Sequence, residues 1–449
     1  MSRLRLLLLL VLVPCTLAAC FVAAPASARP TPRTALAIPA APQLASVTQS
    51  SATIRWGASP GATAYVVTRG AQVVARVPAG TRSYTERGLQ PASWYPYQVA
   101  AVRGSTRSGR TDIIPAVTSA ATACTKYVSW SGSDAGDGSS GAPWRTVSQL
   151  VASWKPGWVG CLRGAFIEDV SIRIGGTKAE PVTLRSDPST GARAYLTGRL
   201  WIAQGADHVR VAGLSLDGRA NVGITRGDLP SPTVNGNDAV FIDNDVYNQR
   251  TRICFDIGSI RGYGTAVGTI VARNRIHDCG ARDSAGNGNN HHHGIYVESG
   301  RATRIVQNAI FQNADRGIQL FPDAQGTLVL GNVLDGNGEG IIFSGGDGFV
   351  SSGNRAIGNV VTNSRTRFDI EYYWENPAQV GRANVVARNC VGGGKWGGIA
   401  LPAKGYTVGA NVTAAPSYVN RRAGDLRPRS GSACRSLLMN PMVPLRPFG

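Results

Sequence analysis

The sequence lacks several patterns that would assign its class directly. It has no Cys-x-x-Cys pair, which argues against a zinc ribbon. Beyond residue 28, no apolar run is long enough to cross a bilayer. Charged residues make up only 16% of the chain, and acidic residues number 27 against 46 Lys and Arg. What is abundant is glycine, with 55 residues, together with recurrent asparagine in the second half. This composition favours short strands joined by turns over helices.

The first residues have the pattern of an export signal. Two arginines precede an unbroken apolar run over residues 6–13, which is too short to be a membrane span. An Ala-Ser-Ala sequence would allow cleavage after residue 28, whereas an earlier Leu-Ala-Ala-Cys resembles a bacterial lipobox and would leave Cys20 lipidated. Residues 29–41, rich in Ala, Pro and Thr, follow as a linker. We expect a protein that is either secreted or lipid-anchored at the outer surface of a bacterium.

Cysteine usage agrees with an oxidising compartment. Six cysteines remain beyond the leader, and an even number in an exported chain favours disulfides over metal ligands. Six cysteines allow about 15 pairings, and we expect neighbours in sequence to pair. The expected disulfides are Cys124–Cys161, Cys254–Cys279 and Cys390–Cys434.

The net charge of +19 has two interpretations. A basic exported protein favours acidic partners, such as uronate polysaccharides, anionic cell-wall polymers, nucleic acid or anionic lipid. The alternative is the arginine bias of a GC-rich genome, because the arginines are scattered and form no basic tract. No specific nucleic-acid motif occurs, and a membrane would be contacted only through a lipid on Cys20. An acidic polysaccharide or cell-wall polymer is therefore the expected partner.

Residues 42–120 have the pattern of a β-sandwich. They alternate with period two and carry turn signals about every 8–12 residues. Trp56 ends one predicted strand, and Leu89, Pro91 and Tyr95 open an alternating apolar segment. Here the chain resembles the fibronectin type III family, with Trp56 at the position of its core tryptophan and the other three at its turn with the tyrosine corner. The resemblance implies a spacer or binding module, and weak attachment to an acidic surface is one role for it.

The second half of the chain contains a sequence repeat whose length is that of one supersecondary unit. Isoleucines after a small or acidic residue are separated by 23, 23, 29 and 29 residues. These isoleucines are Ile295, Ile318, Ile341, Ile370 and Ile399. A second ladder consists of Asn244, Asn274, Asn308, Asn332, Asn359 and Asn389. Such intervals fit coils of a parallel β-helix, in which equivalent residues lie about 4.8 Å apart and asparagine amides bond to one another. Leucine-rich repeats are excluded because their leucine pattern is missing.

These features resemble the pectate lyase-like superfamily of right-handed parallel β-helices over residues 124–440. Residues 127–134 and the helical apolar spacing over 144–154 look like the start of many exported bacterial members. The predicted fold class is all-β, a fibronectin type III-like sandwich followed by a right-handed parallel β-helix. The fold alone specifies no reaction. The chain has neither the repeated Asp-Asp cluster of polygalacturonases nor the Asp-Pro-His run of mannuronan epimerases, so no substrate carries over.

A long polar insertion marks the expected site. It lies between Ile253 and Ile295, 42 residues apart, and four of the five histidines are in or beside it. Long polar loops on a rigid solenoid are where sites usually form. Alignment of the repeats stacks His293, Arg316 and Glu339 at one coil position. Strict alternation would turn them inward, but we expect the corner there to aim them outward.

Further candidates flank this column. His292 and Asp315 form a neighbouring pair, and the following strand should face outward at Tyr296, Gln319, Ile342 and Glu371. Residues 368–374 mix acids and aromatics, which either stack on sugar faces or lie in the core. The expected substrate-binding residues are His292, Tyr296, Gln319, Glu371 and Trp374.

Three functions fit these residues. The first is a lyase or C5-epimerase-like reaction on an acidic (uronate) polysaccharide, in which His293 or His292 removes the proton next to the carboxylate and Arg316 neutralises the charge that develops. The second is a noncatalytic polysaccharide-binding or cell-surface structural protein, in which Asp315, Arg316 and Glu339 form only a polar ladder. The third is a glycoside hydrolase that uses Asp315 and Glu339, whose carboxylates would have to lie about 5–9.5 Å apart.

No cofactor is predicted. A divalent metal held by His277 with one of the three consecutive histidines is an alternative that no ligand motif supports. Adjacent residues on a strand point opposite ways, so the three cannot readily bind one ion together. Calcium would need clustered carboxylates, and Asp347, Asp369 and Glu371 are too dispersed in the sequence.

Overall fold

The computed structural model describes residues 35–219, 229–248, 252–286 and 288–437. The predicted leader over residues 1–28, with Cys20, and the first part of the predicted linker lie outside the described residues. Within the described ranges nearly all regular structure is strand, as the composition predicted. No helix in this part of the chain is long and apolar enough to span a membrane.

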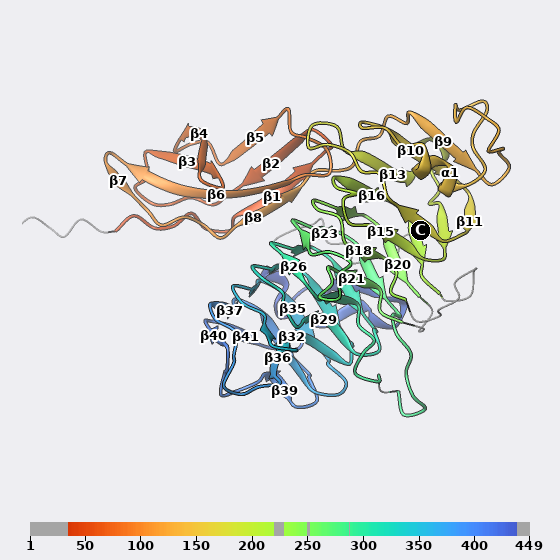
Figure 1. Ribbon diagram of the computed structural model, residues 1–449. Helices are drawn as coiled ribbons and strands as arrows, with labels where there is room; N and C mark the ends of the chain where they lie inside the picture. Colours follow the sequence, from red (N-terminus) through yellow and green to blue (C-terminus); the bar gives the residue numbers. More distant parts are fainter. Residues whose placement is uncertain (1–34, 220–228, 249–251, 287, 438–449) are drawn as a thin grey trace, which may run out of the picture. The chain divides into compact units, whose positions relative to one another are not determined.

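The N-terminal module is a β-sandwich of two antiparallel sheets. One sheet has the order β1-β2-β5, and the other has the order β4-β3-β6-β7 with β8 paired to β6 (Figure 1). The strands are β1 (Gln43–Val47), β2 (Ser51–Arg55), β3 (Ala64–Arg69), β4 (Gln72–Pro78), β5 (Ser83–Arg87), β6 (Trp94–Arg103), β7 (Thr106–Arg107) and β8 (Ile114–Val117).

The sandwich core contains the aromatic residues that the sequence indicated. Trp56 packs edge-on against Tyr65 with ring centroids 5.6 Å apart, and both side chains are buried. The Gln90 backbone N–H donates to the Tyr95 hydroxyl at 2.8 Å, which is the bond of a tyrosine corner. The fibronectin type III-like fold predicted for this segment is confirmed.

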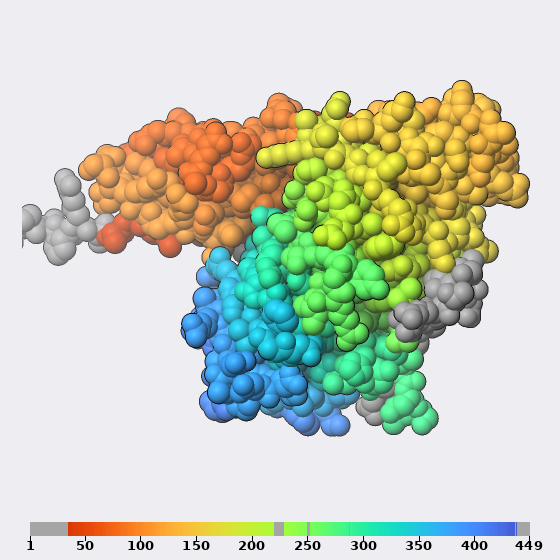
Figure 2. Space-filling model, in the orientation of Figure 1, coloured from red at the N-terminus to blue at the C-terminus, as the bar shows by residue number. Residues whose placement is uncertain are grey.

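The C-terminal part is a solenoid of three parallel sheets, and the chain passes through sheets I, II and III in turn on each coil. Figure 2 shows the coils following one another in sequence order, from yellow through green to blue. Sheet I contains β9 (Lys126–Ser129), β10 (Val159–Arg163), β13 (Val182–Ser186), β16 (Val209–Ala212), β19 (Val240–Ile242), β23 (Ile270–Ala272), β27 (Arg304–Val306), β30 (Leu328–Leu330), β34 (Arg355–Ile357), β37 (Asn384–Ala387) and β40 (Tyr406–Val408).

Sheets II and III have ten strands each. Sheet II contains β11 (Ala165–Ile167), β14 (Tyr195–Thr197), β17 (Ser215–Asp217), β20 (Asp245–Tyr247), β24 (Arg275–His277), β28 (Ala309–Phe311), β31 (Val333–Asp335), β35 (Val360–Thr362), β38 (Cys390–Gly392) and β41 (Val412–Thr413). Sheet III contains β12 (Val170–Ile172), β15 (Leu200–Ile202), β18 (Thr233–Val234), β21 (Phe255–Ile257), β25 (Ile295–Val297), β29 (Arg316–Leu320), β32 (Glu339–Gly346), β36 (Phe368–Trp374) and β39 (Gly397–Ile399), with β33 (Phe349–Val350) paired to β32.

Apolar residues at every second position fill the inside of the solenoid. Ile295 pairs with Ile318, Ile318 with Ile341, Ile341 with Ile370 and Ile370 with Ile399 across neighbouring strands of sheet III. The first four of these isoleucines belong to one continuous core. The spacing of isoleucines in the sequence therefore predicted the register of the coils correctly.

The asparagine ladder forms one continuous chain of side-chain hydrogen bonds between sheets I and II. Asn332 Nδ2 donates to Asn359 Oδ1 at 2.9 Å and to the Ile305 carbonyl at 2.8 Å. Its Oδ1 accepts from both the backbone N–H and Nδ2 of Asn308, each at 2.9 Å. The same pattern recurs at the other rungs, so each amide satisfies backbone groups that the corner would leave unpaired in a buried place.

The solenoid has short elements at both ends and three disulfides. Helix α1 (Val147–Ala152) buries Val147, Leu150 and Val151 over the first coils. The antiparallel pair β42 (Tyr418–Asn420) and β43 (Asp425–Pro428) lies near the other end of the described sequence. The disulfides Cys124–Cys161, Cys254–Cys279 and Cys390–Cys434 are all present, which confirms the pairing by sequence neighbours.

Replacement of one rung should destabilise the solenoid. Asn332→Ala removes the partners of the buried Ile305 carbonyl and the Asn308 N–H. Each buried group left unpaired costs about 1–3 kcal/mol, so we expect the free energy of unfolding to fall by about 2 kcal/mol or more. Chemical denaturation followed by circular dichroism measures it. Asn376→Ala, at an exposed position, is the matched control and should change it by less than about 0.5 kcal/mol. Equal effects of the two substitutions would contradict a structural role for the ladder.

Candidate functional site

One column of side chains runs along the outer face of sheet III. In this sheet Trp201, Thr233, Asp256, Tyr296, Gln319, Ile342 and Glu371 pair one after another from strand to strand. Their sequence neighbours, such as Ile257, Val297 and Leu320, point into the core. Successive residues of a strand face opposite ways, so this column faces outward. The strand register confirms the prediction that one outer face of the sheet contains Tyr296, Gln319, Ile342 and Glu371.

A groove of about 940 Å³ lies over this column. Its floor includes all of the column from Trp201 to Ile342, and its walls come from the loops that follow or precede the strands. Five aromatic side chains line it: Trp201, Tyr263, Tyr296, Phe321 and Tyr373. Five arginines and five acidic residues also line it: Arg199, Arg252, Arg261, Arg316, Arg367, Asp256, Glu298, Glu339, Asp347 and Glu375. The groove therefore offers flat apolar surfaces between charges of both signs.

The predicted column of His293, Arg316 and Glu339 exists, but it is not open to solvent. Arg316 pairs directly with Glu339, and the N–H of Gly294 donates to the Arg316 carbonyl, so the three positions are stacked on adjacent coils. Their side chains line the inner edge of the groove, yet the residues are only 3%, 7% and 6% exposed. The expectation that the corner would turn them out to solvent is wrong.

Hydrogen bonds within the protein explain this burial. Arg316 Nε donates to Glu339 Oε2 at 2.8 Å, and Arg316 Nη1 donates to the Asn290 carbonyl at 2.9 Å. Arg367 Nε lies 3.6 Å from the other oxygen of Glu339. The polar insertion thus lies across the column and is held there by the bond from Arg316 to its backbone. A buried ion pair between Arg316 and Glu339 needs such extra partners to offset the loss of hydration.

His293 is held in its neutral form. Burial lowers its pKa well below the ordinary histidine value, and the charge of Arg316 acts in the same direction. Its Nδ1 has no hydrogen-bond partner, and its ring lies edge-on to Tyr296 with the centroids 5.7 Å apart. His293 is therefore an uncharged imidazole between the core and the groove floor.

The neighbouring pair of His292 and Asp315 fixes the insertion and does not line the groove. Asp315 Oδ2 accepts the backbone N–H of His292 at 3.0 Å, and His292 Nδ1 accepts the N–H of Ala281 at 2.9 Å. Both residues are buried. Asp315 is thus engaged in holding a loop, and of the pair expected for a hydrolase Glu339 lines the groove whereas Asp315 does not.

Glu371 and Trp374 also lie outside the groove lining. Glu371 is buried and accepts two hydrogen bonds from Arg367 Nε, at 2.9 and 3.0 Å, and a third from Nη2 at 2.7 Å. Burial raises its pKa to about 7 despite these bonds, and the charge of Glu339 adds to the rise. Trp374 packs in the main core and donates from Nε1 to the Lys404 carbonyl at 3.0 Å. The sequence left open whether this ring stacks on sugars or lies in the core, and the structure places it in the core.

Two groove carboxylates were not singled out from the sequence. Asp256 is partly exposed on the floor, but its Oδ1 is inaccessible to solvent and has no hydrogen-bond partner. Burial raises its pKa well above the ordinary value, and the charge of Glu298 raises it further, against the effect of Arg199. Burial also raises the pKa of Glu298, whose Oε1 accepts the N–H of Ile260 at 3.2 Å. The sequence feature that could have identified Asp256 is its alignment with Tyr296, one coil later in the repeat.

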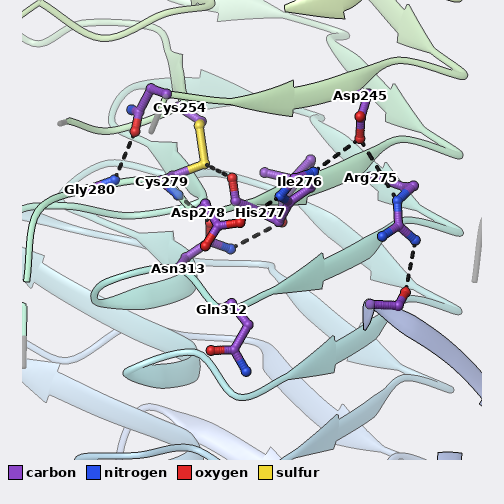
Figure 3. A network of polar contacts seen from close by, with 12 residues as sticks. Asp245, Cys254, Arg275, Ile276, His277, Asp278, Cys279, Gly280, Gln312 and Asn313 are labelled. Atoms are coloured by element: carbon purple, nitrogen blue, oxygen red, sulfur yellow. Dashed lines mark hydrogen bonds and ion pairs between the residues drawn. A yellow bond between two sulfur atoms is a disulfide. The ribbon is translucent and has the colours of Figure 1, made fainter. Parts of the chain in front are cut away.

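His277 lies on sheet II among the polar contacts drawn in Figure 3. It does not line the groove. Its Nε2 is 3.1 Å from Asp245 Oδ1, and its Nδ1 is 3.0 Å from Asp278 Oδ2. The ring is stacked between Tyr247 and Phe311. Both nitrogens are therefore engaged by carboxylates and not directed to any of the three consecutive histidines, one of which the metal alternative paired with His277. The described residues contain no cluster of three or more His, Cys, Asp and Glu suited to a metal ion.

Residues 209–401 match the family model described as the right-handed β-helix region. The chain contains a right-handed β-helix. Among solved structures it is similar to pectate lyase Pel9A, with 17% identity over 65% of this chain and 78% of that one and a TM-score of 0.45. It is similar to a rhamnogalacturonan lyase with 12% identity over 68% and 92% and a TM-score of 0.45. A fibronectin type III domain of human collagen alpha-1(XX) chain shares 27% identity over 22% and 98%, with a TM-score of 0.18. No curated protein matches the chain.

The contacts of His277 predict a stability that depends on pH. Burial opposes its charge, but the hydrogen bonds to Asp245 and Asp278 outweigh this and raise its pKa. A histidine whose pKa is higher in the folded state stabilises the fold fully below its unfolded pKa of about 6.5, and this stabilisation is lost as pH rises through the folded pKa. His277→Gln should therefore lower the free energy of unfolding by about 2 kcal/mol near pH ~5 and by less near pH ~9. Urea denaturation at both pH values measures the difference. The exposed His291→Gln serves as control, and a pH-independent effect of His277→Gln would contradict the prediction.

Proposed function

We propose that this chain is an exported carbohydrate-active protein that binds an acidic, uronate-containing polysaccharide along the groove over sheet III. The observation that carries the proposal is the groove itself, which follows one outward column over six successive strands from Trp201 to Ile342. Equivalent positions repeat about every 4.8 Å in stacked parallel strands. A ligand that is itself a linear repeat can make similar contacts on each coil.

The aromatic side chains suit the rings of sugars. Tyr263 and Tyr373 line the groove and are 62% and 55% exposed, and Tyr296 and Phe321 stack with centroids 6.4 Å apart. A sugar ring has an apolar C–H face that removes aromatic surface from water, while its hydroxyls remain free to bond polar neighbours. Large exposed rings beside hydrogen-bonding groups are therefore the composition that a polysaccharide site needs.

Arg199 supports the acidic character of the ligand. It lines the groove, its guanidinium lies 5.1 Å from the Trp201 ring centroid, and its buried Nε has no hydrogen-bond partner. Burial lowers the pKa of Arg199, which reflects the loss of hydration of its charge. A desolvated guanidinium with an unused N–H is well suited to a carboxylate, because charge-assisted bonds to carboxylates are strong. The net charge of +19 would attract such a polymer from a distance.

A lyase-like reaction on the bound polysaccharide is a second candidate function, beyond binding alone. The observation that favours it is the neutral imidazole of His293 beside the charge of Arg316, because a neutral base can accept the proton next to a uronate carboxylate. Incubation with polygalacturonate and alginate tests it through the ultraviolet absorbance of the new carbon–carbon double bond. Binding without any such absorbance and without new reducing ends would instead favour the noncatalytic alternative.

Removal of one exposed ring should weaken binding without affecting the fold. Tyr373→Ala is expected to raise the Kd for polygalacturonate about tenfold, equivalent to about 1.4 kcal/mol, because it removes a stacking surface from the groove. Isothermal titration calorimetry measures the Kd. Tyr195 is the matched control, since it is 50% exposed on sheet II and does not line the groove. If Tyr195→Ala and Tyr373→Ala bind equally well, the groove is not the binding site.

A second substitution tests whether the ligand's charge is recognised. Arg199→Gln should lower the affinity for polygalacturonate about tenfold and leave the affinity for its methyl ester nearly unchanged, because only the free carboxylate pairs with the guanidinium. Arg173→Gln is the control, because Arg173 also lies over the Trp201 ring, at 4.9 Å, but does not line the groove. Equal binding of the acid and the ester by the unmodified protein would exclude an acidic ligand while leaving a neutral one.

A further inference from the structure

The floor of the groove contains unpaired hydrogen-bonding atoms on both sides of Tyr296. Asp256 precedes Tyr296 by one coil and Gln319 follows it by one coil in the same column. Asp256 Oδ1 and Gln319 Oε1 are inaccessible to solvent and have no partner, and Gln319 is only 8% exposed. An unpaired buried polar atom destabilises the fold, and such atoms at a groove mark the positions where a ligand can supply the missing bonds. Sugar hydroxyls are donors of this kind.

A second carboxylate lies beside this column. Glu298 follows Tyr296 by two residues on the same outward face, so it is the diagonal neighbour of Asp256 one coil further along. It is buried, lines the groove, and is held by the N–H of Ile260. The charges that face Asp256 are those of Glu298 and Arg199. The two carboxylates thus face one space with different surroundings.

We propose that Asp256 and Glu298 are the general acid and the general base that hydrolyse a glycosidic bond in this groove. This inference rests on the proposed polysaccharide ligand and adds a reaction and its residues. Asp256 gives its proton to the glycosidic oxygen as the bond from that oxygen to the anomeric carbon breaks. A water molecule adds to the anomeric carbon, and Glu298 takes its proton. One water is consumed, and the two fragments carry its hydrogen and its hydroxyl.

The environments of the two groups agree with these roles. Burial and the charge of Glu298 raise the pKa of Asp256 well above its ordinary value, which favours the protonated form that a general acid requires. The pKa of Glu298 is raised as well, chiefly by burial, which makes its ionised form a stronger base. Two carboxyl groups in different surroundings on one groove are the pattern that glycosidases use. Tyr296 and Gln319 would hold the sugar between them as binding residues.

Conservative substitutions separate chemistry from binding. Asp256→Asn and Glu298→Gln should lower kcat on polygalacturonate, measured as new reducing ends, by about 10²–10⁴-fold. The Kd from calorimetry should change by less than about threefold, because each amide keeps the shape of the side chain it replaces. Glu180→Gln is the matched control, since Glu180 is exposed and does not line the groove. Circular dichroism confirms that each variant is folded.

The pH profile supplies a readout that a structural role would not change. An acid must be protonated, so the rate of the unmodified protein should fall as pH rises through the pKa of Asp256, and this limb should be absent in the residual activity of Asp256→Asn. A base must be ionised, so the rate should fall as pH drops through the pKa of Glu298, and that limb should be absent in Glu298→Gln. Infrared difference spectra between the unmodified protein and Asp256→Asn should show a protonated carboxyl at neutral pH.

Five outcomes would overturn the assignment. Turnover at the unmodified rate in both variants would exclude the pair, as would an infrared spectrum with Asp256 ionised at neutral pH. New double bonds that accompany the new reducing ends would show elimination, which needs no water and supports the lyase candidate. Binding without any cleavage by the unmodified protein would end this inference while the proposed polysaccharide ligand stands. Absence of binding to polygalacturonate, to alginate and to a neutral glucan would instead remove the proposed function, and this inference with it.

Discussion

The asparagine ladder is the interaction on which the arrangement of this protein depends. Each parallel strand pairs with its counterpart on the next coil, and a slip of one residue would turn every inward isoleucine to the outside. The amide of Asn332 binds both the next rung and the backbone at the corner, so a slipped coil would leave buried groups unpaired. Hydrophobic alternation and the ladder thus impose the same register. Residues that are far apart in the sequence become neighbours on adjacent coils because of that register.

The site follows from this constraint. A column of outward positions collects one side chain from each coil on the surface, so the chemistry of the floor depends on one residue per strand. Asp256, Tyr296 and Gln319 are adjacent on the floor although 63 residues separate the first from the last. The walls depend on insertions, which the stacked strands tolerate because a loop at a corner does not alter the pairing. The polar insertion therefore shapes the groove while its two ends stay fixed by the Cys254–Cys279 disulfide and by Arg316.

Sequence patterns were sufficient to predict the fold and which residues stack in one column. They failed to predict which of those side chains are exposed to solvent. The spacing of isoleucines and asparagines predicted the register, and proximity predicted the disulfides. Alternation also carried a signal that was not used, since counting by two from the inward Ile370 turns Trp374 into the core. The burial of His293 had the same signal, because strict alternation turns it inward with Ile295, and the outward turn expected at the corner was the error. Asp256 was overlooked because a single acid in a strand says nothing until its neighbours on other coils are known.

The net charge of the chain and the charges in the groove would act differently on an anionic ligand. The chain carries +19, yet the groove lining in the described part of the structure has five arginines and five acidic residues. The excess positive charge therefore lies outside the groove, where it can raise the rate of encounter with an anionic polymer but cannot select a sugar. Selection has to come from short-range contacts, in which Arg199 differs from Arg316 because the latter already pairs with Glu339. Added salt should accordingly slow association with the proposed polysaccharide more than it changes the preference among sugars, because long-range fields are screened and desolvated contacts are not.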